Sequence, residues 1–126
     1  MSDQLSLLLA SPSPSDGLPP AVLEILHAAR SIAFSTRIAR GAWGIGLGQK
    51  RKWVLTGACC CPIAALLIVK GAEARENERS PTCAAARVLG ISELAVNQFI
   101  RGFDGGSPDG TSWYAYGARV FLEFRE

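Results

Sequence analysis

The stretch from Trp53 to Gly71, WVLTGACCCPIAALLIVKG, constrains the fold of this chain more than any other. It holds three of the four cysteines in a row, then a proline, then the longest apolar run. The sixteen residues that follow Trp53 carry no charge, which raises the question of a membrane span. A spanning helix needs about 20 apolar residues, whereas Gly57 and Pro62 interrupt this shorter run. The stretch therefore predicts a buried helix that starts at Pro62 and ends at Gly71, and no membrane span.

The composition is that of a globular chain with an uneven distribution of charge. A chain of 126 residues that is 48% hydrophobic can bury its own core and is not a mainly disordered chain. The net charge is only +2, but between Ile25 and Ala72 there are seven basic residues and no acidic one. Such a segment can attract an acidic protein face, a phosphate group or nucleic acid, with a solvated basic edge as the alternative.

Residues 1–20 are expected to form a flexible arm in front of a single globular domain over residues 21–126. Residues 2–10 could form one or two helical turns, and the segment SPSPSDGLPP that follows is typical of an extended linker. The opening MSDQLSLLLA has an acid near its start and only a short apolar run, unlike a signal peptide. We therefore expect a cytoplasmic protein whose thiols are reduced.

Helical periodicity predicts a mainly α domain. The most regular segment runs from Ala21 to Ile38 or Arg40 and is stopped by Gly41, with an apolar stripe along one face. Two shorter helices are expected over residues 82–89 and 93–103, since a glycine follows the first and a capping serine precedes the second. Residues 72–80 and 104–112 are predicted to be surface loops. The members of the stripe are Val22, Ile25, Leu26, Ala29, Ile32 and Ala33.

Two segments are compatible with β structure. Residues 43–56 favour a short hairpin, WGIGL against KWVLT, with a basic turn between the two strands. The glycines of this segment do not have the spacing of a phosphate-binding loop. The tail over residues 113–126 fits a helix better than a strand, so the alternative fold class is α+β with a C-terminal strand. The first helix and the Pro62 helix are expected to pack together, with the helix pair across them.

The cysteines raise the possibility of metal or redox chemistry. Zinc motifs space their ligands by two or more residues, whereas the side chains of consecutive residues diverge. Burial as small apolar side chains is the usual role of free cysteine. Cys61 stands just before a helix start, which can lower the pKa of a thiol. No cofactor is predicted, and the candidate ligands of a metal site are Cys59, Cys60, Cys61, Cys83 and the single histidine, His27.

Residues 84–102, AAARVLGISELAVNQFIRG, resemble a helix-turn-helix. Asn97 and Gln98 are the groups that could contact base edges. The first turn of the second helix, however, would present Glu93 and two apolar residues, which suit a DNA groove poorly. DNA binding is therefore kept as an alternative function. In that case the candidate phosphate contacts are Arg30, Arg37, Lys50, Arg51 and Lys52.

Three further segments, CCCPIAALL, LGISELAVNQFIRGFDGG and YAYGA, together resemble small uncharacterised bacterial and phage proteins. In these proteins a cysteine-containing helix start precedes a helix that is closed by a Phe-Asp-Gly loop. The similarity covers the chain from Trp43 to Ala118, and Ala64 stands where the pattern has glycine. The resemblance implies a compact, mostly helical domain and transfers no activity.

The function expected from these patterns is that of a non-enzymatic binding or regulatory protein that recognises another protein. Aromatic residues dominate interface hot spots, so the candidate contact residues are Trp43, Trp53, Trp113 and Tyr114. Core packing is the alternative use of each of them. A helix-turn-helix DNA-binding regulator and a cysteine-based metal-binding or redox protein are the two rival functions.

Overall fold

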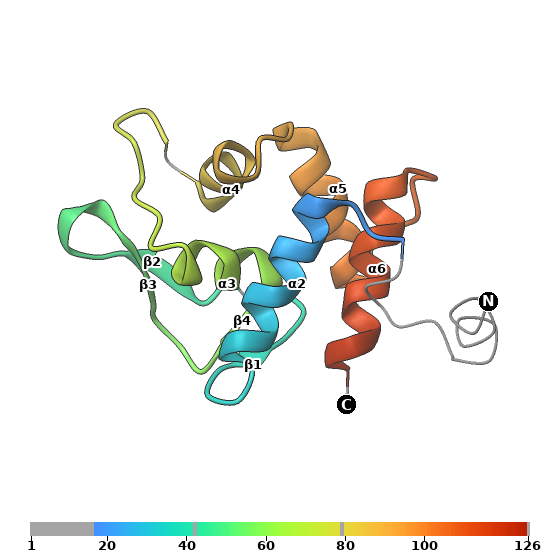
Figure 1. Ribbon diagram of the computed structural model, residues 1–126, viewed down its shortest axis with the longest axis horizontal. Helices are drawn as coiled ribbons and strands as arrows, with labels where there is room; N and C mark the ends of the chain where they lie inside the picture. The colour runs from blue at the N-terminus through green and yellow to red at the C-terminus, as the bar shows by residue number, and fades with distance from the viewer. Residues whose placement is uncertain (1–16, 42, 79, 126) are drawn as a thin grey trace, which may run out of the picture.

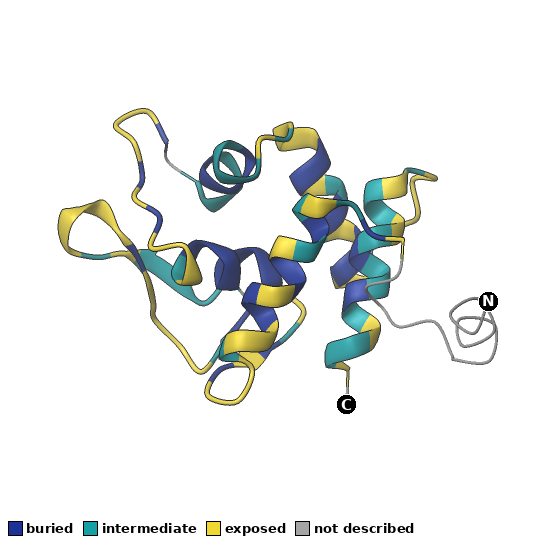
Figure 2. Cartoon of the chain, in the orientation of Figure 1, coloured by how far each residue is buried: buried dark blue, intermediate teal, exposed yellow. Residues whose placement is uncertain are grey.

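Helix α3 (Pro62–Val69) lies at the centre of the protein in the computed structural model, which describes residues 17–41, 43–78 and 80–125. The helix is buried from Pro62 to Leu67, and Figure 2 shows most of it in dark blue. Pro62 occupies its first turn, and the Cys61 sulfur accepts a hydrogen bond from the Ala64 amide at 3.4 Å. The predicted buried helix with a cysteine-rich approach is confirmed.

Four further α-helices among the described residues complete a mainly α fold (Figure 1). Helices α2 (Pro20–Ile32) and α4 (Pro81–Leu89) pack against α3, and α5 (Glu93–Asp104) packs against α6 (Ser112–Phe124). The last three helices begin at side-chain caps, which satisfy amides that would otherwise lack a partner. The capping residues are Ser80, Ser92 and Thr111. The C-terminal segment is thus a helix and not the edge strand that the sequence left open.

Helix α2 is shorter than the sequence predicts. It ends at Ile32, whose carbonyl accepts the Thr36 amide at 2.8 Å. Strand β1 (Arg37–Ile38) follows and pairs in parallel with strand β4 (Cys59–Cys60). The predicted continuation to Ile38 or Arg40 is wrong, because β1 is hydrogen-bonded to a segment about twenty residues away in sequence, which local periodicity cannot reveal. Ala33 is exposed, whereas four members of the predicted stripe are fully buried: Val22, Ile25, Leu26 and Ala29.

The predicted hairpin over residues 43–56 is confirmed. Strands β2 (Ile45–Leu47) and β3 (Trp53–Leu55) are antiparallel, and the 3₁₀ turn η1 (Gln49–Arg51) lies at the tip. The segment after α3 follows the second edge of β3. There the Trp53 amide donates to the Ala72 carbonyl at 3.2 Å, and the Ala74 amide donates to the Arg51 carbonyl at 2.8 Å.

One hydrophobic core joins the helices and the hairpin. It contains residues of every α-helix described, together with Trp53 of β3 and Cys60 of β4. Leu18 is buried and Pro20 begins α2, whereas the rest of the predicted N-terminal arm, residues 1–16, lies outside the described residues. Within the described part of the chain, no helix combines the length and the apolar character that a membrane crossing requires.

Candidate functional site

The structure does not gather the four cysteines and His27, the predicted candidate metal ligands, into one site. In β4, Cys59 is half-buried and Cys60 is buried, because neighbouring side chains of a strand point to opposite faces. Cys83 is half-buried on α4, and His27 lies in a separate shallow cavity between α2 and α3. Among residues 17–41, 43–78 and 80–125, no three histidine, cysteine or acidic side chains are placed to hold a metal ion.

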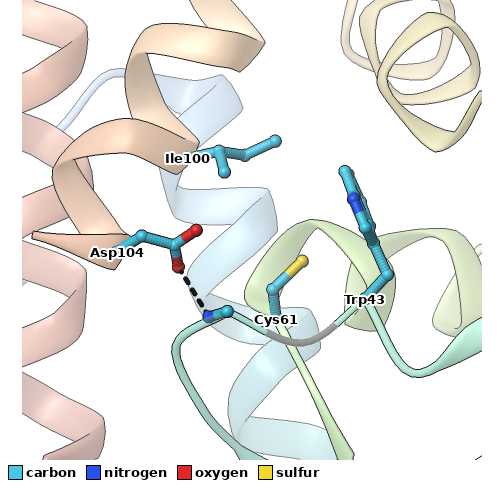
Figure 3. Close-up of a pocket in the computed structure, with 5 residues that line it drawn as sticks. Trp43, Cys61, Ile100 and Asp104 are labelled. Atoms are coloured by element: carbon cyan, nitrogen blue, oxygen red, sulfur yellow. Dashed lines mark hydrogen bonds between the residues drawn. The ribbon is translucent and has the colours of Figure 1, made fainter. Parts of the chain in front are cut away.

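Cys61 lines a small cavity of about 110 Å³ between the segment after β1 and helix α5. Figure 3 shows its sulfur pointing toward the space between Trp43 and Ile100. On the same wall, the Gly41 amide donates to the Asp104 carboxylate at 3.1 Å. This hydrogen bond ties the loop to the end of α5.

The thiol of Cys61 is protonated at neutral pH. Burial raises its pKa to about 12, even though backbone hydrogen bonds from Ala64 and Ile63 act in the opposite direction. Burial likewise raises the pKa of Cys60 to about 11. The expected lowering at Cys61 is wrong, because the loss of hydration outweighs the favourable helix start. Since the thiolate is the reactive form, these two residues are suited to packing and not to nucleophilic chemistry.

The helix pair α4–α5 is present where the sequence predicts it. Gly90 between the helices has a left-handed φ of 69°, and Ser92 caps α5. Exposed side chains at the start of α5 are Glu93 and Leu94, and the Glu93 carboxylate accepts the Cys83 thiol at 3.0 Å. Further along, Asn97 is exposed and Gln98 is half-buried. An acidic and an apolar side chain therefore occupy the first turn of the helix that would enter a DNA groove.

Arg30 and Arg51, both predicted phosphate contacts, have well-defined partners within the protein. Arg30 forms a two-pronged ion pair with Glu123 of α6, in which Nη2 lies 2.6 Å from Oε1. Arg51 donates from Nε to the Ala74 carbonyl and from Nη2 to the Arg75 carbonyl, both at 3.0 Å. Their partners lie 93 and 23 or 24 residues away in sequence, and no local pattern signals such contacts.

The other three basic candidates occupy two separate places. Lys50 and Lys52 are exposed at the tip of the hairpin, whereas Arg37 lines a cleft against α6. Figure 1 shows the hairpin and α6 toward opposite ends of the molecule. The structure therefore does not bring the five predicted basic residues together into one surface.

The four aromatic candidates all have contacts inside the protein. Trp53 is buried in the core, and Trp43 lines the Cys61 cavity. Trp113 packs edge-to-face on Tyr116 with ring centroids 5.5 Å apart. The Tyr114 hydroxyl donates to the Gly106 carbonyl, which fixes the loop before α6.

The hairpin carries exposed apolar side chains that the sequence analysis did not single out. Leu47, Val54 and Leu55 expose 44%, 41% and 38% of their surface, and Lys50 and Lys52 stand beside them. Figure 2 shows the tip as a continuous exposed segment. We call these five residues the hairpin surface, which includes both faces of the hairpin, since Val54 lies on the face opposite Leu47 and Leu55. Alternation along the strands could have indicated that some of these side chains face outward, but not how many stay uncovered.

No family model, curated protein or solved structure matches this chain.

Proposed function

We propose that this protein binds an acidic partner protein through the hairpin surface. The observation that carries the proposal is the combination of three exposed large apolar side chains with two exposed lysines on one small hairpin. Exposed apolar side chains rimmed by polar groups are typical of docking sites. Here Val54 lies on one face of the hairpin, and Leu47 and Leu55 lie on the other. The proposed role is binding, without catalysis.

The two faces of the hairpin differ in what they can contact. Ile45, Leu47, Trp53 and Leu55 share one face, because the pairs Ile45–Leu55 and Leu47–Trp53 lie opposite each other. Trp53 anchors that face in the core, so Leu47 and Leu55 remain at its margins. The outer face carries Val54, which lies over glycines.

Gly46 of β2 and Gly48 just after it add no side chains to the outer face. Gly46 lies opposite Val54, and a β-carbon on Gly48 would lie 3.1 Å from Cγ1 of Val54. Val54 is thus the most prominent apolar side chain of this face. The side chains of Val54 and Thr56 occupy the space beside these glycines, since a β-carbon on Gly46 would lie 3.3 Å from Cγ2 of Thr56.

The tip of the hairpin is held in a defined conformation. Lys50 and Arg51 both have a φ of 58°, a left-handed value that costs about 1 kcal/mol or more for a residue with a side chain. The hydrogen bonds of Arg51 to the carbonyls of Ala74 and Arg75 hold the turn against this cost. A tip that is ordered before binding loses less conformational entropy when a partner docks.

The segment whose carbonyls accept hydrogen bonds from Arg51 is itself bonded to α4. Arg87 donates from Nε to Glu78 at 2.7 Å and from Nη2 to the Glu73 carbonyl at 2.8 Å. The Glu78 carboxylate also accepts the Arg75 amide at 2.9 Å. The hairpin tip is therefore connected to a helix of the core through two arginines.

Charge indicates the chemistry of the partner. The hairpin lies within the segment from Ile25 to Ala72, which has seven basic residues and no acidic one. Like charges would oppose pairing of two such tips, whereas an acidic surface would be attracted to them. We therefore expect a partner whose contact surface combines carboxylates with an apolar patch.

The test is an affinity experiment with matched variants. The full chain, Val54→Ser and Leu122→Ser are used as baits in a lysate of the native host, and any protein recovered is then purified and titrated by calorimetry. Leu122 is exposed on α6, so Leu122→Ser controls for the loss of an exposed apolar side chain away from the hairpin. We expect Val54→Ser to weaken the titrated affinity about tenfold, as the loss of one buried apolar side chain implies.

A second variant tests how much the lysine charges contribute to the affinity. The double variant Lys50→Glu, Lys52→Glu should lower the affinity further at low salt than at high salt. Equal affinity of the wild type and Val54→Ser for the purified partner contradicts the proposal. Binding of duplex DNA at low salt with no protein partner would also contradict it, in favour of the helix pair.

A further inference from the structure

We propose that the partner of the hairpin surface binds as an added β-strand along the free edge of β2. This mode of binding rests on the function proposed above, and it specifies how that partner is recognised. In strand addition, backbone groups of the partner pair with the edge, while its alternate side chains contact the two faces of the sheet. The expected ligand is an extended segment of a protein in which acidic and apolar residues alternate.

The register of the hairpin turns the backbone groups of Ile45 and Leu47 away from β3. Hydrogen-bonded pairs of an antiparallel ladder are spaced two residues apart, so the residues between them point their amides and carbonyls outward. The Trp53 amide follows this alternation, since it donates to the Ala72 carbonyl on the far side of β3. The bonded pairs of the hairpin are Gly44–Thr56, Gly46–Val54 and Gly48–Lys52, with N···O distances of 2.8 and 2.7 Å for the first and the last.

Only β3 has a neighbour on its other side. There Lys52 lies opposite Glu73 in an antiparallel bridge. Among residues 17–41, 43–78 and 80–125, β3 is the one strand paired with β2, and no further segment forms a backbone hydrogen bond with Ile45 or Leu47. Neither residue is buried, and Figure 1 shows the hairpin projecting at one end of the molecule. Two amides and two carbonyls are therefore available to an incoming strand.

The free edge is ordered before a partner arrives. β2 is held by β3, and β3 is held by the buried side chain of Trp53 and by the segment over residues 72–74. Arg87 connects that segment to α4 through the Glu73 carbonyl. An edge that is already extended loses little conformational entropy when a strand is added to it.

Charge at the tip favours an acidic strand over a second copy of this hairpin. Lysines at a sheet edge oppose pairing between identical edges. Lys50 is exposed at the tip, and Lys52 shares the outer face with Val54, because side chains alternate along β3. Leu47 lies on the opposite face. An added strand therefore contacts positive charge on one face and an apolar side chain on the other, which matches alternating acidic and apolar residues.

The test uses a synthetic peptide of about eight residues, the length of an ordinary strand, in which glutamate and valine alternate. It is added to the full ¹⁵N-labelled chain, and binding is followed by two-dimensional ¹H–¹⁵N NMR and by amide hydrogen exchange. We expect saturable shifts centred on β2 and slower exchange of the Ile45 and Leu47 amides, because the peptide accepts these donors. The Gly48 amide is already bonded to Lys52 and should exchange at a similar rate with and without peptide.

Two control peptides separate backbone pairing from charge. The first carries N-methyl groups on a central glutamate and a central valine, which block both of its edges. It should bind about tenfold more weakly, the effect of losing one or two hydrogen bonds. The second has lysine in place of each glutamate and should also bind more weakly, because it is repelled by Lys50 and Lys52.

A variant of the edge gives the matching test on the protein. Leu47→Pro removes an outward amide of β2 without breaking a hydrogen bond to β3, and proline is tolerated at such edge positions. Leu47→Ala is the control, since it shortens the side chain but keeps the amide. We expect Leu47→Pro to bind the peptide about fivefold more weakly than Leu47→Ala, the effect of one hydrogen bond. If Leu47→Pro does not fold, the N-methylated peptide decides on the wild type.

Four results would overturn the proposal: shifts that do not saturate, equal affinities of the N-methylated and the parent peptide, equal affinities of folded Leu47→Pro and Leu47→Ala, or a wild-type dimer that Leu47→Pro converts to a monomer. The last result assigns the edge to a second copy. Failure of the edge is distinct from failure of the hairpin surface. If Val54→Ser still weakens binding of the purified partner, the hairpin surface is the docking site and its contacts are made by side chains alone.

Discussion

Gly102 of α5 and Gly117 of α6 bring the backbones of the two helices into direct contact. A β-carbon on Gly102 would lie 1.9 Å from the Tyr114 carbonyl oxygen, and one on Gly117 would lie 2.0 Å from the Phe99 carbonyl oxygen. Both distances are far below a van der Waals contact, so only glycine permits this crossing. The pair fixes the position of α6 against α5.

Alanine at either glycine is expected to destabilise the protein. Gly102→Ala and Gly117→Ala should each lower the free energy of unfolding by about 1–3 kcal/mol, since the helices must separate to admit a methyl group. Helix propensity alone would give a gain of about 1 kcal/mol. Urea denaturation followed by circular dichroism measures whether each variant gains or loses stability. Gly57→Ala is the control, because a β-carbon on Gly57 meets no atom within 4 Å. A gain in stability from alanine at Gly102 or Gly117 would contradict the close crossing of the helices.

Glycine at position 50 is expected to stabilise the hairpin. Lys50 has a φ of 58°, which glycine adopts without steric cost. Lys50→Gly should therefore raise the free energy of unfolding by about 0.5–1 kcal/mol. Lys52, with an extended φ of −83°, is the matched control, and Lys52→Gly should lower stability. Parallel urea titrations measure the free energy of unfolding of the two variants. A loss of stability at both positions would refute the left-handed turn.

Stability should depend on pH through Glu78. Its hydrogen bonds with Arg87 hold the pKa of this carboxyl below the ordinary value of 4.5. A group whose pKa is lowered in the folded state stabilises the fold above its unfolded pKa, and this contribution is lost as the pH falls through the folded pKa. Denaturation curves from neutral pH to well below pH 4.5 should therefore show a loss of stability on the acid side.

The variant Glu78→Gln isolates this contribution. It should lower the free energy of unfolding at neutral pH by about 1–2 kcal/mol, because Arg87 loses a charged partner, and it should flatten the acid dependence. Glu76→Gln removes an exposed carboxylate from the same segment and serves as the control. Identical acid slopes for Glu78→Gln and the wild type would argue against the role of this pair.

The cysteines should differ in reactivity toward iodoacetamide. Cys60 and Cys61 are buried, with pKa values raised to about 11 and 12, so they should stay unmodified in the folded protein at neutral pH. Cys59 and Cys83 are half-buried and should be alkylated first. Peptide mass spectrometry after a short exposure assigns the sites, and the same reaction in urea should modify all four. Early modification of Cys61 would mean that its thiol is accessible after all.

Much of the helical framework was predictable, because its signals are local. Pro62 and Pro81 stand in the first turns of α3 and α4, while Ser92 caps α5. The hairpin also follows from a local pattern of glycines, β-branched residues and a basic turn. The end of α2 was not predictable, since the pairing of Arg37 with Cys59 joins two segments that local periodicity treats separately.

The candidate sites were less predictable than the fold. The sequence indicated basic residues of possible function, but Arg30 and Arg51 have partners that only the folded chain brings near. It also indicated a low pKa at Cys61, which depends on hydration and not on position alone. The sequence also left open which edge of the hairpin has no neighbour, because the segment that pairs with β3 follows α3 in the chain.

By itself, the sequence determined that a buried helix begins at Pro62, that the domain around it is mainly helical and that a hairpin precedes it. Each of these depends on interactions between residues close in the chain. Only the tertiary structure decided which arginines are committed to internal partners, which thiols lose their water and which apolar side chains of the hairpin remain exposed. Those properties depend on burial, and burial is set by the packing of segments distant in sequence.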